Sequence, residues 1–247
     1  MIAPTIDVIW AAAIGYFFGS IPFSWVVVKL FLRIDIRTIG SKNVGGRNVI
    51  RSFKHEGKSN GLAYTMGIIV AILDIGKGYF SMWFAQFLSV RYANADPWTI
   101  GFASAFAILG HCWPIWLMSH GGRGVATTLG NMIFFNPLFL PIWLVLFFLL
   151  SVPLMYSAIV YLSSFIVMGV VLYFWAYTAF YVSPAQNFMK GFTSDMTIGF
   201  IAMFAMFAIT LIILTRQKAN FQKIKSGEAN RMKLWKIFKG KADEALK

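Results

Sequence analysis

The stretch IDVIWAAAIGYFFGSIPFSWVVVKLFL, residues 6–32, is apolar along almost its whole length. A run of roughly 18 or more mostly apolar residues is long enough for a helix to cross a bilayer. The stretch lacks a preceding basic segment and is longer than the apolar region of a signal peptide, so we expect a retained membrane anchor. Gly15 and Gly19 allow close helix packing, and Pro22 predicts a kink.

The composition of the chain also indicates an integral membrane protein. Of its 247 residues, 58% are apolar and 13% are charged, whereas a soluble domain usually carries about 25% charged residues. The net charge of +13 comes from basic residues that cluster at the ends of apolar runs. This arrangement indicates membrane topology and attraction to anionic lipid rather than nucleic-acid binding. The single cysteine, Cys112, excludes an internal disulfide and a zinc cluster, and we expect neither metal nor cofactor.

Further apolar runs predict further spans. Two of them lie at residues 61–90 and 97–118, and the last lies at 196–214. Residues 125–182 are almost uninterruptedly apolar and are long enough for two spans or for three short ones. A polar interval at 183–195 separates this run from the last span.

The basic segments constrain the number of crossings. Residues 33–60, 120–124 and 216–247 are rich in Lys or Arg and are expected on the cytoplasmic side. If the second and third of these share that side, an even number of crossings separates them, and four crossings fit the apolar length better than two. The sequence therefore predicts an all-α bundle of seven transmembrane helices, with five as the alternative. We expect an outside N-terminus, a membrane domain at 1–215 and a basic cytoplasmic tail at 216–247.

The segment GSKNVGGRNVIR, residues 40–51, has the composition of an anion site. Three glycines free the backbone so that several N–H groups can point at one anion. Hydroxyl, amide and guanidinium groups can hydrogen-bond phosphate oxygens. The alternative is a basic loop whose Gly and Asn residues only make turns, and we favour phosphate binding. The candidate residues are Ser41, Asn43, Gly45, Gly46, Arg47, Asn48 and Arg51.

A second candidate segment is HGGRGVATTLG, residues 120–130, which follows the sequence GHCWP at 110–114. A Gly-Gly-basic-Gly sequence that opens a helix places free N–H groups and the positive helix end beside a cation. The segment is not a Walker A loop, because the spacing and the Lys-Ser/Thr pair are missing. The alternative is a glycine-rich interhelical turn with an ordinary buried histidine. The candidate residues are His111, Gly121, Gly122, Arg123 and Gly124.

Asp74 and Lys77 lie three residues apart in the span 61–90, so they share a helix face. Ionisable side chains inside a membrane are costly and often mark a functional site. Mutual pairing is the simpler explanation here. We therefore favour a structural pair, with a place in the lining of the site as the alternative.

These segments resemble, in their combination and order, the bacterial acyl-phosphate:glycerol-3-phosphate acyltransferases, the PlsY family. The resemblance rests on GSIPF at 19–23, DIR at 35–37, the segment 40–51, DIGKG at 74–78 and the two glycine-histidine segments above. Asn220, with Gly227 and Glu228, resembles the third, cytoplasmic motif of that family. The similarity is dense over residues 15–130 and thin through the later apolar spans.

The resemblance implies a seven-helix enzyme of phospholipid synthesis in the cytoplasmic (inner) membrane, with its site facing the cytoplasm. Such an enzyme transfers an acyl chain from acyl phosphate to the 1-hydroxyl of glycerol-3-phosphate and forms lysophosphatidic acid. The bilayer and the two substrates are its partners. The resemblance implies that Ser41 and Asn220 orient or hydrogen-bond substrate, and that Arg51 and Arg123 neutralise phosphate. An acyl phosphate has a good leaving group, so positioning and charge stabilisation can supply much of the rate.

Three positions depart from the family pattern. Arg123 stands where the family has Lys, Arg47 stands where it has Thr, and Gln217 stands where it has His; the interval 183–195 also looks enlarged. These departures leave open another donor or acceptor, or a non-catalytic homologue. A transporter or channel for an organic phosphate is a further alternative, but it would favour broken helices in repeated halves, and no convincing repeat is evident.

Overall fold

The computed structural model describes residues 6–92, 98–135, 137–154, 156–182 and 196–228. Throughout these ranges the regular elements are helices, which confirms the all-α prediction. The elements are α1 (Ile6–Ser20), α2 (Phe23–Leu32), α3 (Gly46–His55), α4 (Asn60–Tyr92), α5 (Trp98–Cys112), the short 3-10 helix η1 (Ile115–Leu117), α6 (Val125–Phe135), α7 (Phe139–Leu154), α8 (Ser157–Val182) and α9 (Met196–Lys225).

The first predicted span is divided into α1 and α2 at Ile21 and Pro22. Proline has no backbone N–H, so it cannot continue the hydrogen-bond ladder of α1. The carbonyl of Pro22 instead accepts from the N–H of Val26 at 3.0 Å and begins α2. The expected kink is therefore a break, at which the carbonyl of Ile21 accepts from the N–H of Phe23 at 3.2 Å and can accept from a second donor.

Three segments of the described chain are long and apolar enough to cross a membrane: Asp7–Leu32, Asn60–Tyr92 and Trp98–Leu117. They match the first three predicted spans to within a few residues at their ends. Bulky apolar side chains such as Trp83 and Ile72 are exposed on α4, as expected for a helix long and apolar enough to cross a membrane.

The long apolar run forms three helices, α6, α7 and α8, as the second of its two interpretations expects. The 11 residues of α6 span about 16 Å, which is less than the roughly 30 Å of a bilayer core. The number of membrane crossings therefore remains a prediction. The interval 183–195 lies outside the described residues. α9 continues without interruption through residues 215 and 216, so the predicted domain boundary falls inside a helix.

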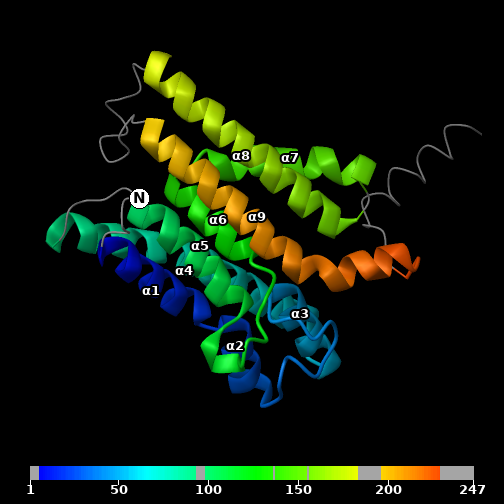
Figure 1. The fold of residues 1–247 in the computed structure, drawn as a ribbon. Coiled ribbons are helices and arrows are strands. Elements are labelled where there is room, and N and C mark those ends of the chain that lie inside the picture. Colours follow the sequence, from blue (N-terminus) through cyan, green and yellow to red (C-terminus); the bar gives the residue numbers. More distant parts are fainter. Residues whose placement is uncertain (1–5, 93–97, 136, 155, 183–195, 229–247) are drawn as a thin grey trace, which may run out of the picture.

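The helices pack as a bundle in which α4 and α5 lie between α1 on one side and α6 and α9 on the other (Figure 1). α7 and α8 lie beyond α9 and α6. Gly15 and Gly19 face the backbone of α5, where a Cβ atom would lie 2.3 Å from the carbonyl oxygen of Ala103 and 2.1 Å from that of Ala107. The small residues thus allow the predicted close approach of α1 and α5.

One end of the bundle carries a smaller packing unit. Its apolar core joins α2, α3 and α4 through side chains such as Val28, Val49 and Phe53. Figure 1 shows α2, α3 and the segment that precedes α6 gathered at this end. Both predicted glycine-rich segments therefore lie at the same end of the molecule.

Candidate active site

Asn48 shapes the first glycine-rich loop. Its side chain is buried, and its amide nitrogen donates to the carbonyls of Ile36 at 3.0 Å and Ile39 at 3.1 Å. Its amide oxygen accepts from the N–H of Ser41 at 3.0 Å. Both amide hydrogens are thus committed to the loop backbone. The structure gives Asn48 an anchoring use, and its predicted contact with phosphate stays a prediction.

This anchored loop leads into α3, whose first turn presents two arginines. Gly45 caps the helix in an extended conformation, and a Cβ atom on Gly46 would lie 2.8 Å from the carbonyl oxygen of Gly67 on α4. Arg47 and Arg51 are exposed and lie one turn apart, so they share a face of α3. Neither guanidinium forms an ion pair with any residue in the described part of the chain.

The remaining candidates of this loop lie beside that face. Ser41 is exposed, and Asn43 is half-buried next to Gly45. Ser41 is fixed through its backbone, since its N–H donates to Asn48, and its hydroxyl is at the loop surface. The loop and the start of α3 therefore carry one exposed hydroxyl and two exposed guanidinium groups.

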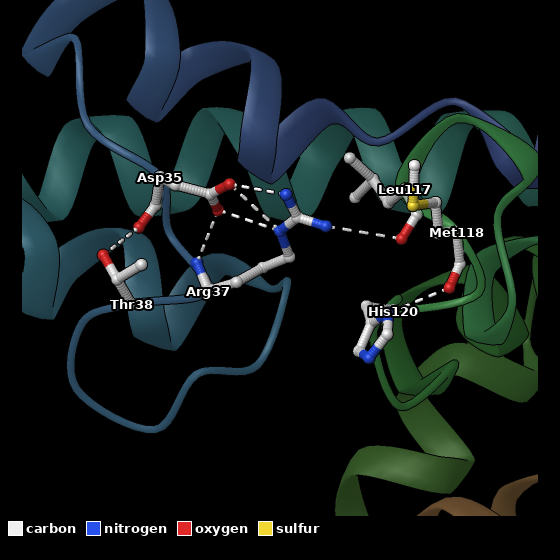
Figure 2. Close-up of polar contacts among 6 residues, drawn as sticks. All are labelled: Asp35, Arg37, Thr38, Leu117, Met118 and His120. Carbon is white, nitrogen blue, oxygen red and sulfur yellow. Dashed lines mark hydrogen bonds and ion pairs between the residues drawn. The ribbon is translucent and has the colours of Figure 1, made fainter.

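Arg37 ties the first loop to the second (Figure 2). Its guanidinium pairs with the carboxylate of Asp35 at 2.6 Å and donates to the carbonyl of Leu117 at 3.4 Å. The hydrogen bond from Arg37 lowers the pKa of Asp35 to about 2. Close to the Leu117 contact, the ring of His120 hydrogen-bonds the carbonyl of Met118 at 2.8 Å. These contacts of Arg37 with Asp35 and Leu117, which we call the clasp, keep the loop before α3 against the loop before α6.

The second loop packs too closely for side chains at its glycines. The N–H of Gly122 donates to the carbonyl of His111 at 3.0 Å. A Cβ atom on Gly122 would lie 2.0 Å from Nε2 of His111 and 2.5 Å from the carbonyl oxygen of Val44. Gly124 adopts a positive φ of 83°, which glycine adopts without strain. Glycine is thus required where the two loops meet.

Arg216 of α9 fixes this loop from the other side. Its guanidinium donates to the carbonyl of Gly121 at 2.8 Å and to that of Gly122 at 3.1 Å. It also lies over the ring of Trp113, 5.6 Å from the ring centroid. Arg216 is not among the site residues that the sequence predicts. The sequence indicates only that Arg216 is the first basic residue after the last apolar run. Ordinary residues at a membrane boundary have the same position.

Arg123 is the half-buried cation between the two loops and α9. One terminal nitrogen donates to the side-chain oxygen of Asn220 at 3.2 Å. Burial lowers the pKa of Arg123, and the nearby guanidinium groups of Arg47, Arg51 and Arg216 lower it further. Positive charge therefore accumulates around Arg123. Such a cluster is stabilised by an anion with several oxygens, such as a phosphate.

Asp74 and Lys77 form the predicted ion pair, with Nζ and Oδ1 3.0 Å apart and both side chains buried. Lys77 also donates to the carbonyl of Ile21 at 2.8 Å, as a second donor to this carbonyl at the break between α1 and α2. The ring of His111 lies 3.6 Å from the same carboxylate oxygen of Asp74. This cluster supports the helix break, and it explains how the ionisable side chains are accommodated.

A small pocket of about 10 Å³, roughly the size of one water molecule, lies between this cluster and the two loops. Its walls include the helix break, the Asp74–Lys77–His111 cluster, Val44 of the first loop and Gly122 of the second. The structure thus brings together both predicted loops, the buried ion pair and the start of the third motif. The polar side chains have different partners. Asn48 and Lys77 hydrogen-bond backbone carbonyls. The guanidinium groups of Arg47, Arg51 and Arg123 remain available to an anion.

The chain is similar to known proteins along most of its length. The family model described as glycerol-3-phosphate acyltransferase matches residues 9–227. The glycerol-3-phosphate acyltransferase of Helicobacter pylori (strain ATCC 700392 / 26695) is 32% identical over 190 residues, which cover 76% of this chain and 82% of the relative. That of Erythrobacter litoralis (strain HTCC2594) is 42% identical over 120 residues, which cover 49% of this chain and 53% of the relative.

Two solved structures share the fold. Both are crystal structures of PlsY (YgiH), an integral membrane glycerol 3-phosphate acyltransferase, one in a glycerol 3-phosphate form and one in a lysophosphatidic acid form. Their TM-scores are 0.66 and 0.64, at 23% and 22% identity, and each comparison covers 91% of this chain and 95% of the solved chain. With the sequence match across nearly its whole length, this chain belongs to the glycerol-3-phosphate acyltransferase family.

Proposed function

We propose that this protein transfers an acyl chain from acyl phosphate to the 1-hydroxyl of glycerol-3-phosphate, and releases lysophosphatidic acid and inorganic phosphate. The observation that supports this proposal most directly is the convergence of three separate segments on one cationic site. Arg51 comes from α3, Arg123 from the loop before α6, and Asn220 from α9. Both substrates carry phosphate, so two anions meet where this positive charge accumulates.

The proposed chemistry needs charge stabilisation more than a protein base. The hydroxyl oxygen of glycerol-3-phosphate attacks the carbonyl carbon of the acyl phosphate, and the bond from that carbon to the phosphate oxygen breaks. The hydroxyl proton passes to a phosphate oxygen. Arg51 and Arg123 stabilise the negative charge on the phosphates, while Ser41 and Asn220 orient the reacting groups. Asn43, Arg47 and the backbone of Gly45, Gly46, Gly121, Gly122 and Gly124 complete the phosphate contacts in this proposal.

The same proposal places the site at the cytoplasmic face of the cell (inner) membrane, with the N-terminus outside. The support is the distribution of basic residues, since the loops and the end of α9 that carry Lys and Arg lie at one end of the bundle. If α1 and α2 count as one broken span, then α4 to α9 add six helices to it. Counting each of these helices as a crossing, we propose seven crossings, of which α6 is the shortest, with the glycine-rich loops and the basic tail on one side of the bilayer.

Transport of an organic phosphate would need a path past the buried ion pair. Asp74 and Lys77 instead face each other at 3.0 Å, and Lys77 is further engaged by the carbonyl of Ile21. These contacts give the pair a structural use. The observations therefore favour an acyltransferase over a transporter.

The deciding assay uses the purified full chain in detergent, radiolabelled glycerol-3-phosphate, and either palmitoyl phosphate or palmitoyl-CoA. We expect labelled lysophosphatidate with palmitoyl phosphate, and loss of product in Arg51→Ala and in Ser41→Ala. Lys54→Ala is the matched control. Lys54 also lies on α3, but its ammonium group donates a hydrogen bond of 3.3 Å to the hydroxyl of Tyr64 on α4. Product with palmitoyl-CoA alone would refute the proposed donor. No product with either donor would refute acyl transfer.

A further inference from the structure

Arg123, Asn220 and Gln217 form a chain of side-chain hydrogen bonds. Arg123 donates to Oδ1 of Asn220 at 3.2 Å, and Nδ2 of Asn220 donates to Oε1 of Gln217. Gln217 and Asn220 lie three residues apart on α9 and so share a helix face. Gln217 is fully buried, with 0% of its surface exposed, whereas Asn220 is half-buried.

The chemistry of the three groups fixes the direction of this chain. A guanidinium has donors only, so Asn220 must turn its oxygen toward Arg123. The amide nitrogen of Asn220 then faces Gln217, which must present its own oxygen as the acceptor. A side chain at 217 without an acceptor would leave the Asn220 amide held by Arg123 alone, with its NH₂ group unpaired and its plane free to rotate away from the bonding geometry.

Gln217 is held in this orientation although its other end is unsatisfied. Its Nε2 atom is buried and has no hydrogen-bond partner among the residues that the structure describes. A buried donor without a partner is unfavourable. The benefit of Gln217 therefore lies in the oxygen that it offers to Asn220.

We propose that Gln217 is a positioning residue that holds Asn220 with its oxygen toward Arg123, and that its amide keeps this arrangement independent of pH. The inference rests on the proposed function and deepens it, because Gln217 acts on the phosphate site only through Asn220. An imidazole is the residue that the family pattern places here. It accepts a hydrogen bond from Asn220 only while one ring nitrogen is unprotonated.

The surroundings of this chain of hydrogen bonds are cationic. On α9 itself, Arg216 and Lys218 flank Gln217 in the sequence. The pKa of Arg123 is lowered by burial and by the charges of Arg47 and Arg51 on α3 and of Arg216 on α9. Tyr161 of α8 acts in the opposite direction and raises it. The charge of Arg216 also acts on His111 of α5. An imidazolium at position 217 would be buried beside these cations, so a histidine there should titrate below its usual pKa of about 6.5.

The test compares wild type, Gln217→His and Gln217→Met in the palmitoyl phosphate assay between pH 5 and pH 8.5. Methionine matches the length of glutamine but offers no comparable acceptor. We expect Gln217→Met to lower kcat/KM about tenfold at every pH, as for the loss of one hydrogen bond to a charged group, with an unchanged melting temperature. We expect Gln217→His to equal wild type at pH 8 and to lose activity relative to wild type as the pH falls below about 6.

Binding of inorganic phosphate by calorimetry gives a second readout that needs no turnover. We expect Gln217→Met to weaken phosphate binding about tenfold at pH 7.5. Wild-type kcat/KM and wild-type phosphate affinity in Gln217→Met would overturn the inference, as would a constant ratio of Gln217→His to wild type across the pH range. An inactive wild type that binds phosphate in a Gln217-dependent manner would instead overturn the proposed function and leave the positioning role supported.

Discussion

Replacing Asn48 by alanine tests whether this side chain shapes the site or binds substrate. The change removes two donors, to the carbonyls of Ile36 and Ile39, and one acceptor, for the N–H of Ser41. The bond to Ile36 is buried, so its loss carries a full desolvation penalty of about 1–3 kcal/mol. The other two bonds are partly buried, and each contributes about 0.5–1 kcal/mol because water can replace the lost partner.

The local free energy of opening of this loop should therefore fall by about 3 kcal/mol in Asn48→Ala. Hydrogen exchange reports that free energy directly, because the N–H of Ser41 is itself bonded to Asn48. A decrease of about 3 kcal/mol corresponds to roughly 100-fold faster exchange of that amide. Acyl transfer should fall as well, since Ser41 and the start of α3 lose their fixed placement.

Asn43→Ala is the matched control, because Asn43 lies in the same loop and is half-buried. We expect it to raise KM without changing exchange of the Ser41 amide. If Asn48→Ala raised KM while exchange across residues 36–41 stayed at the wild-type rate, the anchoring role would be wrong, and Asn48 would be a substrate ligand as the sequence predicts.

Three further changes probe the loops around the site. Asp35→Asn should loosen the clasp with Arg37 and lower the melting temperature at neutral pH. Because the folded-state pKa of Asp35 is lowered to about 2, its contribution in wild type is fully present above the unfolded value of about 3.9 and is lost as the pH falls toward 2. Melting curves from pH 2 to pH 7 should therefore converge for the two proteins only at the acid end, and parallel curves would contradict the clasp. Gly122→Ala should abolish most activity and destabilise the fold by about 1–3 kcal/mol, since its Cβ would lie 2.0 Å from Nε2 of His111. Gly61→Ala, where no atom lies within 4 Å of the added Cβ, should match wild type in the same melting and activity measurements. Arg47→Thr should raise KM for glycerol-3-phosphate roughly three- to tenfold at low salt, with a smaller effect at high salt because exposed charges are screened. An increase that does not depend on salt would exclude a charge effect.

The helices were predictable because their signals are local. The segment 61–90 became Asn60–Tyr92, and the proline in the first span separated α1 from α2. The division of residues 125–182 into three helices was left open by the sequence. Its length admits either two or three helices, and apolar composition does not show where each helix ends. The pairing of Asp74 with Lys77 followed from their spacing on one helix.

The sequence predicted which segments come together but not what each side chain contacts. A polar residue in a glycine-rich loop can point toward a ligand or toward its own backbone, and composition does not distinguish these. Asn48 therefore looked like a phosphate ligand. Arg216 was missed because its partners, Gly121 and Gly122, are distant in the sequence. The bond from Arg123 to Asn220 is equally long-range, and only the family resemblance indicated that these residues meet.

The most direct test of a single phosphate site shared by α3 and the loop before α6 is the binding of glycerol-3-phosphate to the purified chain. Calorimetry should show one binding event for wild type and for Lys54→Ala. We predict that Arg51→Ala and Arg123→Ala each weaken this binding at least about tenfold, the effect of losing a charge-assisted hydrogen bond. Wild-type affinity in either arginine variant would contradict a site that both segments share.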